Sequence, residues 1–327
     1  MQAPNTALSA DIHHLYKLAT GFWASGVLFA AIKLDLFNKL GENDYTLDTI
    51  ARKIKANKQW TEKLLLACTA LGLLVRQNGR YKNSHLAAAY LLEGKPYYQG
   101  DLFKHLATLW NRFGSLDSTI ATGNRSETMT GGNEWILSSH SIAISGYAEL
   151  LARQLDLSNR SKLCDIGGGT GTYSAVLCLK YPHLQAVIVE DPEVVPLAKQ
   201  FIARLGLEHR IEVRPCKLLY DEYGSDYDVA LISGVLHGLS ERNCKKLLSK
   251  AHRSLRAEGL LILQEILLDE DDPQPLPALF SLNMTLGASY SEEQLLAWLY
   301  ATGFIKAKVE PIQGGLWLNH IITAIRP

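Results

Sequence analysis

Leu163-Cys164-Asp165-Ile166-Gly167-Gly168-Gly169-Thr170-Gly171 is the stretch of sequence that decides the fold. An apolar run meets three consecutive glycines, and an apolar segment follows, which predicts a strand, a glycine turn and a helix. The alternate glycines Gly167, Gly169 and Gly171 have no side chain, so the backbone can approach a ligand closely at these positions. The stretch therefore predicts a ligand site where a strand passes into a helix.

The chemistry of this turn argues against a dinucleotide. A dinucleotide fingerprint requires G-x-G-x-x-G, but its last position here is Thr172, and Asp165 ahead of the turn would repel a pyrophosphate. S-adenosylmethionine (SAM) fits better, because it carries an ammonium and a sulfonium and no phosphate. A tight turn without a ligand is the alternative, although so many adjacent glycines are entropically costly without a reason. We therefore expect the turn to bind SAM and its product S-adenosylhomocysteine.

An acidic residue ends the next expected strand. Glu190 follows Asp165 by 25 positions, close to the offset of about 20 at which an acid accepts hydrogen bonds from ribose hydroxyls. The alternative is a solvated acid before Pro192. Because the spacing is set by the strand-helix-strand unit, we expect Glu190 to point into a cofactor cleft.

The rest of the C-terminal half continues this alternation of strand and helix. Short β-branched runs lie at Lys162–Ile166, Ala186–Glu190, Ile211–Pro215, Asp228–Ser233, Leu260–Glu265, Lys306–Pro311 and His320–Ile325. This pattern predicts an α/β fold with a doubly wound, mostly parallel, seven-stranded Rossmann-like sheet covered by helices on both faces. Ligands of such sheets bind at the carboxyl ends of the strands, where Gly167, Glu190 and His237 fall.

The N-terminal part has a helical pattern. The spacing of apolar residues predicts one helix from Leu15 to Leu40 that ends at Gly41. Its most apolar stretch, Gly21 to Ile32, is shorter than the roughly 20 residues that span a bilayer. We therefore expect a buried core helix and no membrane partner.

Two shorter helices and a hairpin follow. Thr46 is expected to cap a helix through Lys55, and a second helix is expected over Lys58–Leu74. A small β-wing is expected at Leu74–Arg76 and Arg80–Lys82, with its turn at Asn78-Gly79. This is the outline of a winged helix. Between about Gly100 and Asp156 we expect further helices, with a polar loop over Thr122–Asn133 that would suit a substrate lid.

Composition excludes some classes of function. Lys plus Arg and Asp plus Glu are each 33, so the formal net charge is zero and gives no long-range field to collect nucleic acid. The five cysteines are scattered and contain no C-x-x-C pair, so neither a disulfide framework nor a zinc site is expected. The N-terminus lacks the features of a signal peptide. We expect a cytoplasmic protein with no nucleic-acid partner and no metal.

From Trp23 to Pro327 the sequence resembles class I O-methyltransferases that carry a winged-helix dimerisation domain, including plant caffeate-type and bacterial natural-product enzymes. The resemblance is most specific in four segments: Asp165–Gly171, Glu190-Asp191-Pro192, Val235-Leu236-His237 and Leu260–Glu265. It implies that His237 is the general base and that Glu265 orients it. It also implies cofactor contacts at Asp191, Cys216, Lys217 and Ser233, and a homodimer. The chain then divides into a dimerisation domain (1–100), linking helices with the lid (101–158) and a SAM-binding domain (159–327).

The sequence departs from this family beside the expected base. The family usually writes His-Asp-Trp where this chain has His237-Gly238-Leu239, and a Gly-Asp pair where it has Cys216-Lys217. Ser289 stands where a second acid often flanks the base. His140, beside the expected lid, is a further candidate for the substrate site, whereas His209, His252 and His320 are expected to be surface or packing residues.

The function that these observations favour is methyl transfer from SAM to a phenol or enol hydroxyl of a small molecule, in secondary metabolism. An imidazole with a pKa near 6.5 can take the hydroxyl proton as the methyl group transfers. One alternative is a SAM-binding enzyme of the same fold with other chemistry, such as a hydroxylation, a decarboxylation or a pericyclic step. A winged-helix regulator is another, but Lys58–Leu74 is rich in leucine and carries only two basic residues, so we expect this helix to be buried.

Overall fold

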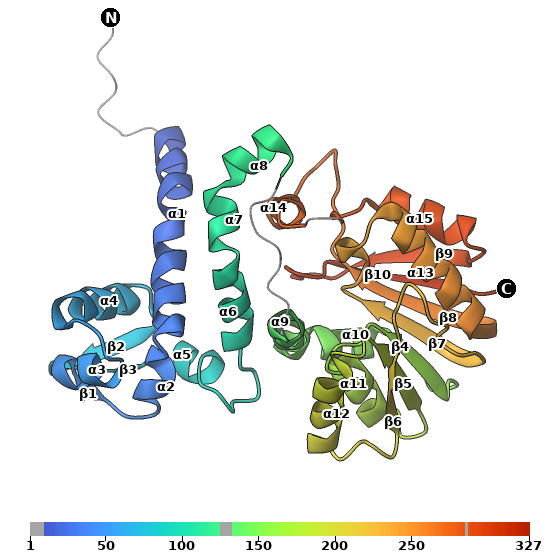
Figure 1. Cartoon of the computed structure of the whole chain (residues 1–327), viewed down its shortest axis with the longest axis horizontal. Coiled ribbons are helices and arrows are strands. Elements are labelled where there is room, and N and C mark those ends of the chain that lie inside the picture. Colours follow the sequence, from blue (N-terminus) through green and yellow to red (C-terminus); the bar gives the residue numbers. More distant parts are fainter. Residues whose placement is uncertain (1–9, 125–132, 285–286) are drawn as a thin grey trace, which may run out of the picture. The chain divides into compact units, whose positions relative to one another are not determined.

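The computed structural model describes residues 10–124, 133–284 and 287–327. The chain forms two compact units, Met1–Thr108 and Leu109–Pro327 (Figure 1). Residues 101–158, expected as one linking segment, are divided between these units. Most of the loop expected as a lid, residues 125–132, lies outside the described residues.

The single helix expected over Leu15–Leu40 is wrong, because the structure breaks it. Helix α1 covers Ala10–Lys33 and α2 covers Leu36–Leu40. Asp35 between them adopts the left-handed conformation with φ 57°, which aspartate tolerates better than most residues. The Asn38 side chain donates a 2.7 Å hydrogen bond to the Asp35 carboxylate. The break therefore has a local cause that periodicity does not reveal.

The remaining elements of the N-terminal unit follow the winged-helix outline. They are β1 (Tyr45–Thr46), α3 (Leu47–Lys53), α4 (Lys58–Ala70), β2 (Leu74–Gln77), β3 (Arg80–Asn83), α5 (His85–Tyr90) and α6 (Gly100–Thr108). The wing forms as expected, and β1 adds a third strand in the order β1-β3-β2. The Thr46 hydroxyl accepts the Thr49 amide and caps α3. Helix α4 ends at Ala70 rather than Leu74, because Gly72 turns the chain with φ 72°.

Apolar surface on α1 and α4 corrects the expectation that both helices are buried. The side chains of Phe22 and Trp23 are 55 % and 64 % exposed, and Trp60 on α4 is 67 % exposed. Asp11–Lys33 is long and apolar enough to cross a membrane by length and composition alone, and its most apolar window is 6 % buried. Length and composition of this kind are equally found in helices that pack against protein.

The second unit is built on a seven-stranded sheet. Its strands are β4 (Lys162–Ile166), β5 (Gln185–Glu190), β6 (Ile211–Pro215), β7 (Tyr227–Ser233), β8 (Leu255–Glu265), β9 (Ile305–Pro311) and β10 (His320–Ile325). Their spatial order is β6-β5-β4-β7-β8-β10-β9. Strand β10 runs in the opposite direction to the other six strands. All seven expected strands are confirmed. The strand order reverses at β4, so the glycine turn after β4 lies at the topological switch point.

Helices cover both faces of this sheet (Figure 1). Helices α10 (Ala148–Gln154), α11 (Thr172–Lys180) and α12 (Val195–Arg204) pack on one face, and α13 (Glu241–Ser254) and α15 (Glu292–Ala301) pack on the other. The remaining elements are α7 (Trp110–Gly114), α8 (Leu116–Thr122), α9 (Glu134–Ile142), the π-helical turn η1 (Ala143–Tyr147), the 3₁₀ turn η2 (Leu236–Gly238) and α14 (Pro275–Ser281). The doubly wound α/β fold is confirmed.

Candidate active site

The glycine turn between β4 and α11 needs glycine at its alternate positions. Gly167, Gly169 and Gly171 have φ values of 72°, 56° and 79°, a region that residues with a side chain rarely adopt. A Cβ atom on Gly167 would lie 2.9 Å from the Val235 side chain, and one on Gly171 would clash with Ile188. The turn is therefore fixed by both backbone conformation and close packing.

Asp165 lies beneath this turn as a buried carboxylate. Its side chain is on the last part of β4, is 1 % exposed and accepts a 2.6 Å hydrogen bond from the Ser174 hydroxyl. Burial raises the pKa of Asp165 to about 7, against the Ser174 hydrogen bond, and the charge of Glu190 raises the pKa further. A nearby cation would relieve this cost and favour the ionised form.

Glu190 at the end of β5 is the second buried carboxylate of the site. One of its oxygens accepts the Gly169 amide at 2.8 Å, and the other accepts the Asp191 amide at 2.7 Å. Burial raises the pKa of Glu190, while these two amides act in the opposite direction. Each carboxylate oxygen keeps a second lone pair, which a hydroxyl group can use as an acceptor.

Cys216 and Lys217 follow β6 beside Glu190. The Cys216 amide donates to the Glu190 carbonyl at 2.7 Å, and the buried thiol has a raised pKa because of desolvation. The Lys217 amide donates to the Asp221 carboxylate at 2.8 Å, whereas its side chain is exposed. Here the backbone of this segment approaches the site, and the Lys217 side chain faces solvent.

Asp191 and Ser233 occupy different settings. Asp191 is exposed, and its side chain accepts the Glu193 amide at 3.4 Å. Ser233 ends β7 and donates a 3.1 Å hydrogen bond to the Gln264 side chain on β8. The structure therefore brings Ser233 to the carboxyl edge of the sheet, with its hydroxyl directed to the neighbouring strand.

His237 and Glu265 form a side-chain pair that joins η2 to the end of β8. The Nδ1 atom of His237 lies 2.9 Å from Oε2 of Glu265. The other oxygen, Oε1, accepts the amides of Val235 at 2.8 Å and Leu236 at 2.6 Å. Glu265 is 2 % exposed and His237 is 20 % exposed. The carboxylate is thus fixed by the backbone and holds one nitrogen of the ring, while the ring stays accessible.

An aromatic side chain packs against the imidazole. The Phe280 ring on α14 lies 5.1 Å from the His237 ring in an edge-to-face arrangement. Gly238 is exposed, and a Cβ atom there would meet nothing within 4 Å. Ser289 is buried and donates a 2.9 Å hydrogen bond to the Pro277 carbonyl, which ties its segment to α14. The departures at 238 and 289 therefore leave the His237–Glu265 pair intact.

The comparison with known families agrees with this geometry. Residues 110–304 match the O-methyltransferase domain, and residues 16–93 match the O-methyltransferase dimerisation domain. The chain belongs to the O-methyltransferase family.

Similar proteins cover nearly the whole chain. A 3-hydroxy-5-methyl-1-naphthoate 3-O-methyltransferase of Streptomyces sahachiroi is 33 % identical over 315 residues, which span 88 % of both chains. Acetylserotonin O-methyltransferase of Bos taurus is 31 % identical and covers 89 % of this chain and 91 % of its own. The crystal structure of human N-acetylserotonin methyltransferase with SAM has a TM-score of 0.87 at 24 % identity, covering 98 % of this chain and 99 % of that one.

This O-methyltransferase uses SAM, and the residues of the glycine turn fit that cofactor. Two buried carboxylates, Asp165 and Glu190, suit a ligand with cationic groups and hydroxyls. A Cβ atom on Gly169 would meet only Ile136, at 3.7 Å, so a side chain there would enter space beside the turn. The described residues contain no group of three or more His, Cys, Asp or Glu side chains placed to hold a metal ion.

Sequence reasoning missed several residues of this O-methyltransferase site. Ser174, in the first turn of α11, donates a hydrogen bond to Asp165. The Leu218 and Val235 side chains pack close to Gly167. Leu218 follows Lys217 directly, and the cofactor contacts expected at Cys216 and Lys217 stay a prediction. Ser174 had a signal, because a polar residue at the start of a buried helix often faces a neighbouring polar group.

His140 lies beside the start of α11. Its Nδ1 atom lies 2.7 Å from the Thr172 hydroxyl, and its ring packs on Phe201 at 4.6 Å. His140 therefore lies next to the glycine turn, and its role in the substrate site stays a prediction. His252 and His320 are packing residues as expected, and burial lowers the pKa of both.

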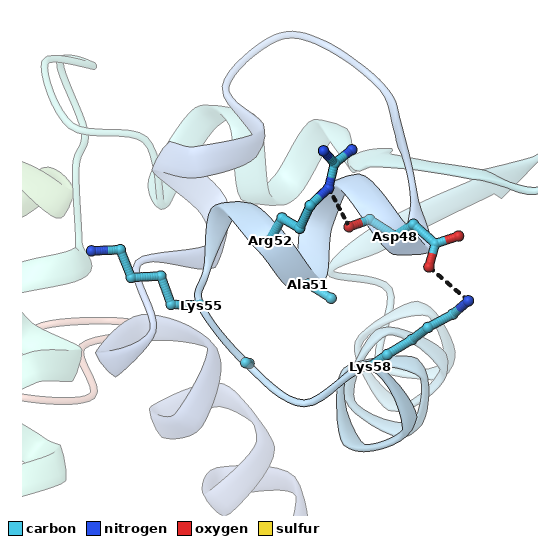
Figure 2. A pocket seen from close by; sticks show the side chains of 6 residues that line it. Asp48, Ala51, Arg52, Lys55 and Lys58 are labelled. Atoms are coloured by element: carbon cyan, nitrogen blue, oxygen red, sulfur yellow. Dashed lines mark hydrogen bonds and ion pairs between the residues drawn. The ribbon is translucent and has the colours of Figure 1, made fainter.

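A separate open pocket lies in the N-terminal unit and contains none of these residues. It is lined by Asp48, Ala51, Arg52, Lys55, Ala56 and Lys58. Figure 2 shows Asp48 and Lys58 paired, at 2.6 Å, with Lys55 directed away from them. The acid offsets one of the three cations that line the pocket, so two positive charges remain.

Proposed function

We propose that this enzyme methylates an aromatic or enolic hydroxyl of a small molecule, with His237 as the general base. The observation that carries the proposal is the His237–Glu265 pair, which leaves one ring nitrogen free at an accessible position. The relative from Streptomyces sahachiroi supports the class of acceptor, because its name describes methylation of a hydroxyl on a naphthoate.

The cofactor half of the mechanism depends on the glycine turn. SAM, when bound, supplies an electrophilic methyl group on its sulfonium. Asp165 and the backbone of Gly167–Gly171 would hold the amino-acid end, and Glu190 would accept hydrogen bonds from the ribose hydroxyls. These residues bind and orient, which suffices for a displacement that depends on alignment.

The proton half depends on the tautomer of His237. With Nδ1–H donating to Glu265, the lone pair is on Nε2, which can accept the proton of the acceptor hydroxyl. Glu265 then stabilises the imidazolium that forms, and it cannot rotate away because two backbone amides hold its other oxygen. The proton returns to water after the product leaves.

We further propose that the enzyme is a homodimer formed through its dimerisation domain. Phe22 and Trp23 lie on a helix whose apolar surface the single chain leaves uncovered. A second copy of the chain is the occupant that the matched dimerisation domain implies.

The direct test of the proposed reaction is incubation of the purified enzyme with methyl-labelled SAM and a panel of phenols, enols, carboxylates and amines. We expect label in an ether product of a phenol or enol, identified by mass spectrometry. Label only in esters or methylamines, or an acceptor converted without gaining a methyl group, would contradict the proposal.

A further inference from the structure

The hydroxyl of Tyr147 binds a loop that is distant in sequence. It accepts the Leu316 amide at 2.6 Å and the Trp317 amide at 2.9 Å, across 169 and 170 positions. Tyr147 is 9 % exposed, and both hydrogen bonds are part-buried. One side chain therefore fixes two successive backbone groups of the turn between β9 and β10.

A local irregularity directs Tyr147 to this loop. Between α9 and α10 the chain forms the π-helical turn η1, in which Gly146 adopts φ 119°. A π-helical turn changes the direction in which later side chains point, and such turns occur often at functional sites. Leu151 of α10 remains in the core of the sheet. The chain therefore kinks at Gly146, directly before Tyr147, between α9 and α10.

The loop that Tyr147 binds is also held at its other end. The Asn319 side chain accepts the Leu267 amide at 2.7 Å and donates to the Leu267 carbonyl at 2.8 Å. Leu267 lies two residues beyond Glu265, the partner of His237. The loop is therefore connected on one side to η1 and on the other to the segment that directly follows β8, the strand that ends at Glu265.

Trp317 extends from this loop toward the proposed base. Its ring lies 6.4 Å from the Phe280 ring, and Phe280 lies 5.1 Å from the His237 ring, both in edge-to-face geometry. Rings in this arrangement offer apolar faces to a planar aromatic molecule beside the imidazole. The Trp317 and Phe280 rings together are called the Trp317–Phe280 wall. The position of the Trp317 ring in this wall depends on its backbone, whose amide the Tyr147 hydroxyl binds.

We propose that Tyr147 is a positioning residue for the acceptor: through Leu316 and Trp317 it holds the Trp317–Phe280 wall against which an aromatic acceptor binds beside His237. This inference rests on the proposed hydroxyl acceptor. The Tyr147 hydroxyl contacts the Leu316 and Trp317 amides, and Tyr147 lies on η1, outside the glycine turn. Its removal therefore weakens acceptor binding and leaves SAM binding unchanged.

The test compares Tyr147→Phe with Tyr181→Phe in the full-length protein. Tyr181 is a matched control, because its buried hydroxyl also binds a backbone group, the Leu155 carbonyl at 2.7 Å, and takes no part in the wall. Hydrogen–deuterium exchange measures the exchange rates of the Leu316 and Trp317 amides. Quenching of 2-naphthol fluorescence measures binding of a planar phenol with S-adenosylhomocysteine present, and calorimetry measures SAM affinity.

We expect faster exchange at Leu316 and Trp317 and about 10-fold weaker 2-naphthol binding in Tyr147→Phe alone, since two hydrogen bonds are lost. SAM affinity should stay within twofold of wild type. Trp317→Phe should bind 2-naphthol more tightly than Trp317→Ala.

Equal 2-naphthol affinity in wild type and Tyr147→Phe, including no measurable affinity in either, would overturn the proposal. Unchanged exchange at the two amides, or a parallel loss of SAM affinity, would do the same. None of these readouts requires turnover, so an error in the assignment of His237 as base would leave them unaffected and would be seen separately.

Discussion

The Nδ1 atom of His237 lies 2.9 Å from Oε2 of Glu265, and the same carboxylate accepts two backbone amides through Oε1. The Glu265 carboxylate therefore contacts three successive residues, Val235, Leu236 and His237. This arrangement fixes the ring orientation and its tautomer before an acceptor arrives, which is how a supporting carboxylate contributes to a general base.

Glu265→Gln tests this supporting role. An amide can still contact the ring but carries no charge to stabilise the imidazolium, so we expect kcat to fall about 10- to 100-fold. SAM affinity should not change. The exposed Glu270→Gln is the control and should have wild-type kcat. A wild-type rate in Glu265→Gln would remove Glu265 from the mechanism.

Gly169→Val tests the cofactor turn. The position has φ 56°, and a Cβ atom there would contact the Ile136 side chain at 3.7 Å beside the turn. We expect SAM binding to disappear in calorimetry. Gly206→Val is the matched control, since Gly206 has φ 67° and free space but lies at the end of α12. Comparable loss of SAM affinity in both variants would indicate a general effect of strain instead.

Asp165 predicts a pH dependence of stability in the ligand-free enzyme. Burial raises its pKa in the folded enzyme to about 7, above the ordinary aspartate value of 3.8. The folded state therefore favours the protonated form of Asp165. The stabilisation of the folded state by this preference is complete below about pH 4 and is lost as the pH rises to about 7. The free energy of unfolding of Asp165→Asn, relative to that of the wild type, should therefore be about 1–2 kcal/mol higher at pH 8 than at pH 5.5.

Thermal unfolding at the two pH values measures this difference. The exposed Asp271→Asn should show no pH-dependent gain. Bound SAM should reverse the trend in the wild type, because a cation beside Asp165 favours the ionised form. A gain for Asp165→Asn that is equal at both pH values would show that the charge of Asp165 is not costly in the folded enzyme.

The proposed dimer depends on the exposed apolar face of α1. The double variant Phe22→Glu, Trp23→Glu should be monomeric by light scattering at micromolar concentration, whereas the wild type should have twice the chain mass of 36.2 kDa. Leu205→Glu changes an equally exposed apolar residue outside this domain and should stay dimeric. A monomeric wild type would contradict the proposal.

Local sequence patterns were sufficient to predict the strands of the sheet and the glycine turn after β4. Gly167–Gly171 and the strand before it depend on neighbouring residues, and the position of Glu190 follows from the length of one strand-helix-strand unit. The break at Asp35 was not predictable from apolar spacing, because Leu34 and Leu36 fit a continuous helix equally well.

The aromatic wall could not be predicted for a different reason. Tyr147, Phe280 and Trp317 come from three separate segments, and an apolar residue in a short helix or loop gives no sign of its distant partner. The exposure of Phe22 and Trp23 was also misjudged, because apolar composition indicates burial but does not say whether the covering surface belongs to the same chain.

His237→Ala tests the central claim most directly. General-base assistance contributes typically 10²–10⁴-fold, so we expect kcat for a phenolic acceptor to fall by about that factor while the SAM dissociation constant stays within twofold. Turnover is measured with methyl-labelled SAM, and affinity is measured by calorimetry on the same preparation. Near-wild-type turnover in His237→Ala would contradict the account, and alignment of the reactants alone would then have to explain the rate.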